Sequence, residues 1–272
     1  NGAFQAGQGI EEELQDGAIF RVSPRFGMTY DLSGRGEMIV RGGFAILYDR
    51  PQGNQVFDMG TNAPGVLVST LQWGLLQNLS SATSDPNVVL SLNPTAHEFK
   101  PPRSRQWNVG VQRKLARNFI ADIAYVGSKS DDLLRQSQIN ALPFGATLAP
   151  GNQDPTRAPA ATLGSSALPT DLLRPYPGYG NLRMWDYSGY GNYNALQASI
   201  TRRFDQGWSF SGFYVWSKAL AINSVDASAG VPNLSEAETR RLDYSLTDYD
   251  RPHNFVVNAI YQIPKFASGP LG

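Results

Sequence analysis

The sequence predicts an all-β fold: an antiparallel up-and-down transmembrane β-barrel segment of about seven strands, with short turns on one side and long loops on the other. Three observations predict it. Apolar and polar residues alternate with a period of two in several segments, the connections between these segments are short and long in turn, and aromatic residues gather at the segment ends.

The clearest alternation lies in residues 105–128. Trp107, Val109 and Val111 alternate with amide side chains and glycine, and the pattern resumes after a short turn at 115–118. Alternation over about ten residues on both sides of a turn predicts a long β-hairpin. Its apolar face would pack on a second sheet in a soluble β-sandwich, or would face lipid in a membrane barrel.

The remaining segments distinguish these two alternatives. Five more strands are predicted, at 26–32, 38–49, 194–204, 208–217 and 254–263. Short turns are predicted at 33–37 and 205–207, long connections at 50–104, 129–192 and 218–251, and short strands within the first of these at 66–71 and 88–92. Long loops are uncommon in compact soluble domains, whereas short turns at one end and long loops at the other are typical of outer-membrane barrels.

The aromatic residues support the membrane alternative. Five fall near the predicted long loops: Tyr48, Trp107, Tyr125, Trp216 and Phe255. Five others fall near the short turns: Tyr30, Phe119, Phe204, Trp208 and Tyr261. Two aromatic girdles around an aliphatic band match the two interfaces of a bilayer. Basic residues beside the short turns, Arg202 among them, are interpreted as solvated charges.

Composition excludes several classes of function. The chain has 23 basic and 23 acidic residues and no cysteine, so we expect no nucleic-acid partner, no disulfide and no thiolate metal site. Known catalytic and phosphate-binding motifs are absent, so we expect no enzyme, no catalytic residue, no metal and no cofactor. We interpret residues 1–23 as an irregular N-terminal segment and 24–272 as a partial outer-membrane β-barrel domain, cut from a longer protein.

Several motifs, in order along the chain, resemble the barrel of Oar-like TonB-dependent outer-membrane receptors. They lie at 24–32, 41–49, 106–113, 124–128, 174–180, 192–197, 214–219 and 248–255. The resemblance implies a location in the outer membrane of a Gram-negative bacterium, with outer-membrane lipid as a partner. It also implies a larger barrel with a plug domain inside it, and ligand uptake driven by the TonB complex. About seven strands do not close a barrel wide enough for a plug.

The polar face of the predicted strands supplies candidate binding residues. The lumen-facing candidates that would hydrogen-bond the plug or a ligand are Arg41, Asn108, Gln112, Asp122, Gln197, Thr201 and Asn258. The extracellular ligand would be a peptide, a protein or a glycan, and the sequence does not choose among them. The alternatives are a non-transporting outer-membrane adhesin or assembly protein, and a soluble β-sandwich binding module.

Two smaller features of the last long connection have competing interpretations. Asp243, Asp248 and Asp250 form an oxygen-rich cluster that suits Ca²⁺, although hydrogen bonding within the rim, with Arg251 as a partner, is the preferred interpretation. His253 stands at the mouth of a predicted strand, where a rim hydrogen bond is expected rather than metal ligation.

Overall fold

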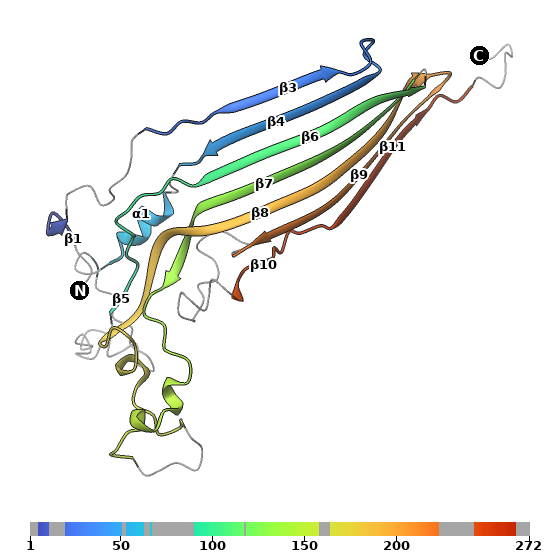
Figure 1. Cartoon of the computed structure of the whole chain (residues 1–272). Coiled ribbons are helices and arrows are strands. Elements are labelled where there is room, and N and C mark those ends of the chain that lie inside the picture. The colour runs from blue at the N-terminus through green and yellow to red at the C-terminus, as the bar shows by residue number, and fades with distance from the viewer. Residues whose placement is uncertain are drawn as a thin grey trace, which may run out of the picture.

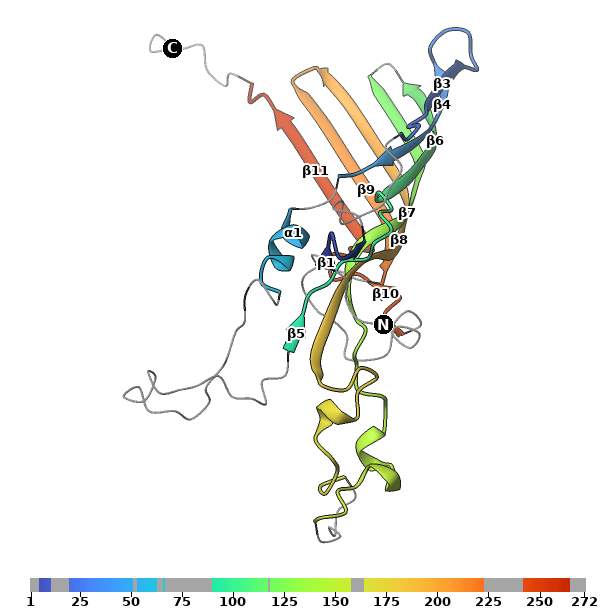
Figure 2. The same cartoon turned by 90° about the vertical axis from the view of Figure 1, so that its left-hand side faces the viewer.

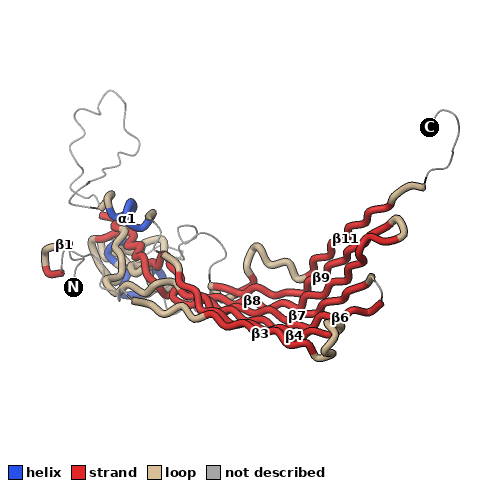
Figure 3. Tube along the Cα trace, turned by 90° about the horizontal axis from the view of Figure 1, so that it is seen from above, coloured by secondary structure: helices blue, strands red, loops and turns tan. Residues whose placement is uncertain are grey.

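The chain forms one long, curved antiparallel sheet with an arm at one end (Figure 1). The computed structural model describes residues 5–10, 20–50, 53–62, 66, 90–116, 118–157, 164–222 and 242–264. Within these residues the main sheet has nine strands. Viewed from above, the strands lie side by side in a single layer (Figure 3).

The long strands follow one another across the sheet in chain order. They are β3 (Arg25–Asp31), β4 (Met38–Tyr48), β6 (Arg103–Ala116), β7 (Phe119–Gln138), β8 (Tyr179–Asp205), β9 (Trp208–Ala221) and β11 (His253–Tyr261). Each pairs antiparallel with its neighbours in the sequence. The predicted up-and-down arrangement is therefore confirmed, and β3 and β11 form the two edges of the described sheet.

Short elements accompany the sheet. They are β1 (Gln5–Ala6) paired with β2 (Gly9–Ile10), the helix α1 (Asn54–Met59), β5 (Leu90–Leu92), which pairs parallel with β8, and β10 (Ser245–Leu246), which pairs with β9. Three single-turn 3₁₀ helices, η2 (Ala146–Leu148), η3 (Pro150–Asn152) and η4 (Thr170–Leu172), lie in the arm. No helix in the described part of the chain is long and apolar enough to cross a membrane.

The predicted tight turns are present. Asp205 pairs with Trp208, which leaves Gln206 and Gly207 as a two-residue turn, with φ of 50° and 84°. Positive φ at both central residues matches the right-handed twist of the flanking strands. All the short turns lie together at the upper right of Figure 1, and α1, β5 and the arm lie at the other end.

The prediction of a connection throughout 129–192 is wrong. β7 continues to Gln138 and β8 begins at Tyr179, so both strands run well beyond the rest of the sheet. The β7–β8 register shifts between Ser130 and Leu133 and again between Leu133 and Arg135. Such bulges bend a strand, and Figure 2 shows the resulting arm projecting away from the short turns.

Glycine makes this bend possible. A Cβ on Gly189 would lie 2.7 Å from the carbonyl oxygen of Leu133, so no other residue fits against β7 there. Of the two short strands predicted before β6, the second is present as β5, whereas residues 67–71 of the first lie outside the described residues. The helix α1 was not predicted.

The most buried residues are in the arm rather than in the sheet wall. Trp185 and Asn140 are both 0% exposed. The wall instead exposes large apolar side chains. This distribution differs from a soluble domain, in which apolar side chains gather in one central core.

Candidate functional site

One face of the sheet is apolar and uncovered. Val109, Ile123 and Val257 are 53%, 57% and 47% exposed, and Ile200 is 36% exposed. The pairing registers put these residues on the same face, and no second layer covers them within the described residues. A soluble β-sandwich would bury such side chains, so the fold rules out that alternative.

The other face carries the predicted polar residues. Residues paired across neighbouring strands point to the same face. By this rule Arg41, Asn108, Gln112, Asp122, Gln197, Thr201 and Asn258 all share the face opposite to Val109 and Ile123. Their role in binding remains a prediction.

Two of the candidates form an ion pair. Arg41 on β4 reaches across β6 to the carboxylate of Asp122 on β7. Gly110 is the residue of β6 directly opposite Arg41, and its lack of a side chain leaves the path open. Gln112 pairs in register with Asp122. The two charged side chains are 46% and 20% exposed, so the pair contributes little to stability.

The other candidates are distributed over the same face. Asn108 lies over Gly43, where a Cβ would be 3.0 Å from Asn108 Nδ2. Thr201 and Asn258 lie on opposite sides of Ser211, with which both pair in register. The structure therefore brings the candidates together in small groups and not in one cluster.

A cavity of about 310 Å³ opens on this polar face near the long loops. The residues that line it are Tyr193, Gln197, Val215, Ser217, Ala219, Tyr249, Asp250, Arg251 and Asn254. Gln197 is thus a predicted candidate that lines this cavity. Two tyrosines, two amides and a guanidinium supply both flat surfaces and hydrogen-bond donors, which suits a polar ligand.

The segment that leads into β11 forms one wall of the cavity. Asp250 Oδ1 accepts a hydrogen bond from the backbone N–H of Ala219 at 2.8 Å, and Ser217 Oγ donates to the carbonyl oxygen of Arg251 at 3.0 Å. Arg251 Nη1 donates to the carbonyl oxygens of Asp248 and Asp250, at 3.2 and 2.8 Å. These bonds hold Arg251 at the cavity.

The hydrogen bonds of Asp250 and Arg251 support the interpretation that the acidic cluster of Asp243, Asp248 and Asp250 serves hydrogen bonding within the rim. The described residues contain no group of three or more acidic or histidine side chains able to hold a metal ion. Asp250 is used in the hydrogen bond to β9, and burial raises the pKa of Asp243 while the positive charge of Arg135 opposes this rise. The predicted rim hydrogen bond of His253 is confirmed, with Nδ1 2.8 Å from the hydroxyl oxygen of Tyr214.

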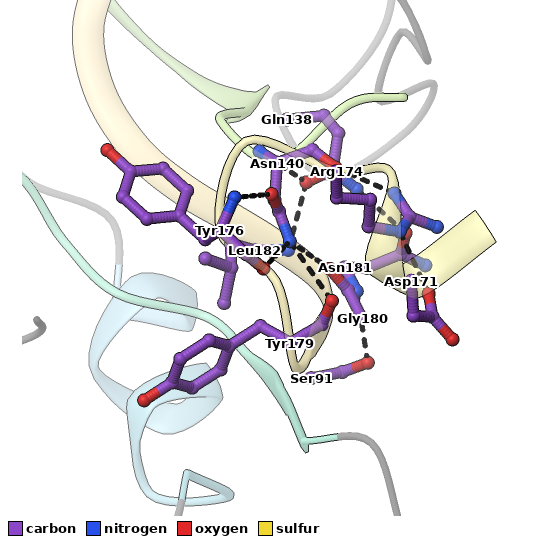
Figure 4. Close-up of polar contacts among 10 residues, drawn as sticks. All are labelled: Ser91, Gln138, Asn140, Asp171, Arg174, Tyr176, Tyr179, Gly180, Asn181 and Leu182. Atoms are coloured by element: carbon purple, nitrogen blue, oxygen red, sulfur yellow. Dashed lines mark hydrogen bonds and ion pairs between the residues drawn. The ribbon is translucent and has the colours of Figure 1, made fainter. Parts of the chain in front are cut away.

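The arm is organised around a buried amide, Asn140 (Figure 4). Its Nδ2 lies 2.9–3.1 Å from the carbonyl oxygens of Tyr176, Tyr179 and Gly180. Its Oδ1 accepts a hydrogen bond of 2.8 Å from the backbone N–H of Tyr176. One side chain thus closes the loop between β7 and β8 by satisfying backbone groups that would otherwise be buried without partners.

Neighbouring side chains extend this network. Gln138 Oε1 accepts hydrogen bonds from the backbone N–H groups of Asn140, at 3.3 Å, and Leu182, at 2.9 Å, and its Nε2 donates to Asn181 Oδ1. Arg174 donates to the carbonyl oxygen of Asn140 at 2.7 Å and pairs with Asp171. These bonds join the two ends of the loop where it leaves β7 and enters β8 (Figure 4).

A buried charge pair lies where the arm leaves the sheet. Arg135 Nε is 3.6 Å from Asp186 Oδ1, and the two residues are 4% and 7% exposed. Ser137 and Ser188 donate hydrogen bonds to the Asp186 carboxylate. Sequence reasoning missed this pair and Asn140, because polar residues in a glycine-rich and proline-rich stretch are typical of an exposed loop.

These features define a class of protein. A single antiparallel layer with an uncovered apolar face, a polar face and long loops at one end is part of the wall of a transmembrane β-barrel. The chain belongs to the outer membrane beta barrel domain family, whose model matches residues 1–271. Its location is therefore the outer membrane of Gram-negative bacteria.

A solved transporter structure shares this fold. The outer membrane transporter YddB from Escherichia coli superposes with a TM-score of 0.53 at 14% identity, over 88% of this chain and 26% of that one. Overlap with the ferric-catecholate import receptor Fiu from E. coli is weaker, with a TM-score of 0.39 at 13% identity, over 89% of this chain and 22% of that one. The chain thus spans about a quarter of each of these proteins. No curated protein matches it.

Proposed function

We propose that this chain forms part of the wall and outer loops of a TonB-dependent outer-membrane transporter, which takes up a ligand by an energised process. The observation that carries the proposal is the two-faced sheet, whose apolar face is exposed and whose polar face holds all seven candidates and a cavity near the long loops. The ordered motifs of Oar-like receptors and the fold shared with YddB support it.

The two edge strands of the described sheet, β3 and β11, are where we expect further strands of the barrel to pair. β3 pairs with β4 alone and β11 with β9 alone, so each leaves a row of backbone groups unpaired within the described residues. In a bilayer such groups require partners, because lipid offers no hydrogen bonds. Further strands of the same protein would pair with both edges and enclose a plug.

The polar face would then line the lumen. Side chains such as Asn108, Gln112 and Asn258 would hydrogen-bond the plug in the resting state or the ligand during passage. The cavity beside Gln197 and Arg251 lies near the long loops, where an incoming ligand first meets the polar face. The ligand would be a peptide, a protein or a glycan.

The test uses the full-length protein. Its coding sequence is expected to contain a plug domain and a TonB box before this segment, and the purified receptor is expected to bind the periplasmic C-terminal domain of TonB. Deleting the TonB box should abolish that binding. A gene without a plug, or a receptor that does not bind TonB, would contradict energised transport.

The alternative is a non-transporting outer-membrane adhesin or assembly protein, and the surface of the arm favours it. Phe144, Leu148 and Leu172 are 90%, 50% and 57% exposed, and Tyr176 is 42% exposed. Exposed apolar side chains on a shaped loop are typical of a protein-binding surface. Absence of the plug together with retained binding of a partner by the arm would support this function.

A further inference from the structure

A group of basic residues lies on the apolar face, at the end of the sheet near the long loops. Arg105 on β6 is directly opposite Lys129 on β7, and both point to the same face as Trp107 and Val109. Lys218 on β9 shares this face, because it pairs with Asn194, which lies in register with Gly127 and hence with Trp107. Arg103, which pairs with Asp131, lies two residues further along β6 on the same face.

The protein neutralises this group only in part. Arg103, Arg105 and Lys129 all converge on Asp131, with Arg103 Nη2 and Lys129 Nζ at 3.6 and 4.0 Å. Asp132 is a second carboxylate, 3.9 Å from Arg103. Two carboxylates thus face three cations.

Further donors in the group lack partners. Lys218 has no ion-pair partner among the described residues. The Nε atoms of Arg103 and Arg105 are buried without a hydrogen-bond partner. Asp131 lies between the opposed Arg105 and Lys129, but the group as a whole, with four cations and two carboxylates, keeps two uncompensated positive charges.

The position of the group along the strands indicates which external anion balances this excess of positive charge. Trp107 and Tyr125 belong to the aromatic girdle that marks the outer boundary of the hydrocarbon. Arg105 is two residues beyond Trp107 toward the loops, a rise of about 7 Å. The basic side chains therefore lie at the level of the lipid headgroups of the outer leaflet and face outward, away from the lumen.

We infer that Arg103, Arg105, Lys129 and Lys218 bind the phosphate groups of an anionic lipid of the outer leaflet. The lipid's acyl chains would pack on the apolar face below, beside Trp107 and Val109. Lys129, with 55% of its side chain exposed, supplies a flexible ammonium group, and the arginines supply fixed guanidinium groups. This inference rests on the family and the fold and does not depend on transport.

The experiment uses the full-length protein in a neutral detergent. It is titrated with diphosphoryl lipid A, and bound lipid is counted by native mass spectrometry. The double variant Lys129→Gln, Lys218→Gln is expected to weaken binding roughly thirtyfold, and Lys129→Gln alone roughly fivefold. Binding of phosphatidylcholine is expected to be the same for all variants. Heat-modifiable mobility in gel electrophoresis checks that each variant is folded.

A matched control removes two charges at the other end of the sheet. Arg35→Gln, Arg113→Gln is expected to leave lipid A affinity within about twofold of the parent. Parental affinity in the Lys129→Gln, Lys218→Gln variant would overturn the inference. An equal loss in the control would also overturn it, because the attraction would then be a property of net charge and not of this site.

Discussion

Trp107 and Gly127 lie directly opposite each other in the β6–β7 pair, and the indole ring fills the space above the glycine. A Cβ on residue 127 would be 2.5 Å from Trp107 Nε1. The glycine therefore fixes the position of a tryptophan at the predicted lipid boundary.

Gly127→Ala is expected to displace the indole and to lower the free energy of unfolding by about 1–3 kcal/mol, as overpacking does elsewhere. Urea titration of the full-length protein in detergent, followed by tryptophan fluorescence, measures the change. Gly27→Ala is the control, since a Cβ there would meet nothing within 4 Å. Equal free energies of unfolding for the two variants would show that the close packing of Trp107 on Gly127 does not contribute to stability.

Asn140→Ala is expected to loosen the arm without unfolding the barrel wall. The change removes the donor to the carbonyl oxygens of Tyr176, Tyr179 and Gly180, and a buried carbonyl oxygen such as that of Gly180 costs about 1–3 kcal/mol when left unsatisfied. Hydrogen exchange in residues 139–157 and 164–180 should accelerate at least tenfold, while exchange in β6 stays unchanged. Leu172→Ala, on the exposed surface of the same loop, should have no such effect.

The two carboxylates that pair with arginine should respond differently to removal. Asp186→Ala removes one carboxylate partner of the buried Arg135, which keeps its hydrogen bond to Ser188, and is expected to destabilise the base of the arm by about 2–3 kcal/mol. Asp122→Ala breaks the more exposed pair with Arg41 and should cost less than about 1 kcal/mol. Hydrogen exchange around each residue measures the destabilisation that each substitution causes. A larger destabilisation by Asp122→Ala than by Asp186→Ala would contradict this ranking of the two ion pairs.

Arg202 should stabilise the turn between β8 and β9. Its guanidinium carbon lies 3.7 Å from the centre of the Trp208 ring and its Nη1 donates to the carbonyl oxygen of Asp205 at 2.9 Å. Arg202→Gln is expected to cost about 1–2 kcal/mol in urea titration, whereas Arg203→Gln, on the exposed neighbour, should cost less than about 0.5 kcal/mol. Indistinguishable variants would mean that Arg202 is a surface charge.

The wall of the sheet was predictable because its signal is local. Alternation around Val109 and Ile123 gives the strands, and the turn chemistry at Gly207 gives the hairpin. Once the strands and the hairpin are known, strand pairing determines that Arg41, Asn108 and the other candidates point to the same face of the sheet.

The arm and the cavity were not predictable in this way. Asn140 is buried only because the loop folds back upon it, and Tyr193 and Tyr249 line the same cavity only because β11 pairs with β9. The interpretation of Arg202 as a solvated charge is wrong for the same reason: it is 7% exposed, since Trp208 and Phe119 come from two other strands.

Quenching by brominated lipid tests the membrane assignment most directly. This chain has no cysteine, so once any cysteine elsewhere in the full-length protein is replaced, a single fluorophore can be placed at Val109→Cys, Ile123→Cys or Val257→Cys on one face, and at Asn108→Cys, Gln197→Cys or Asn258→Cys on the other. In the full-length protein in bilayers, the first three are predicted to be quenched by bromine in the acyl chains and the last three to be shielded from it. Shielding of the first three, or equal quenching of both sets, would contradict the assignment of the apolar face to lipid.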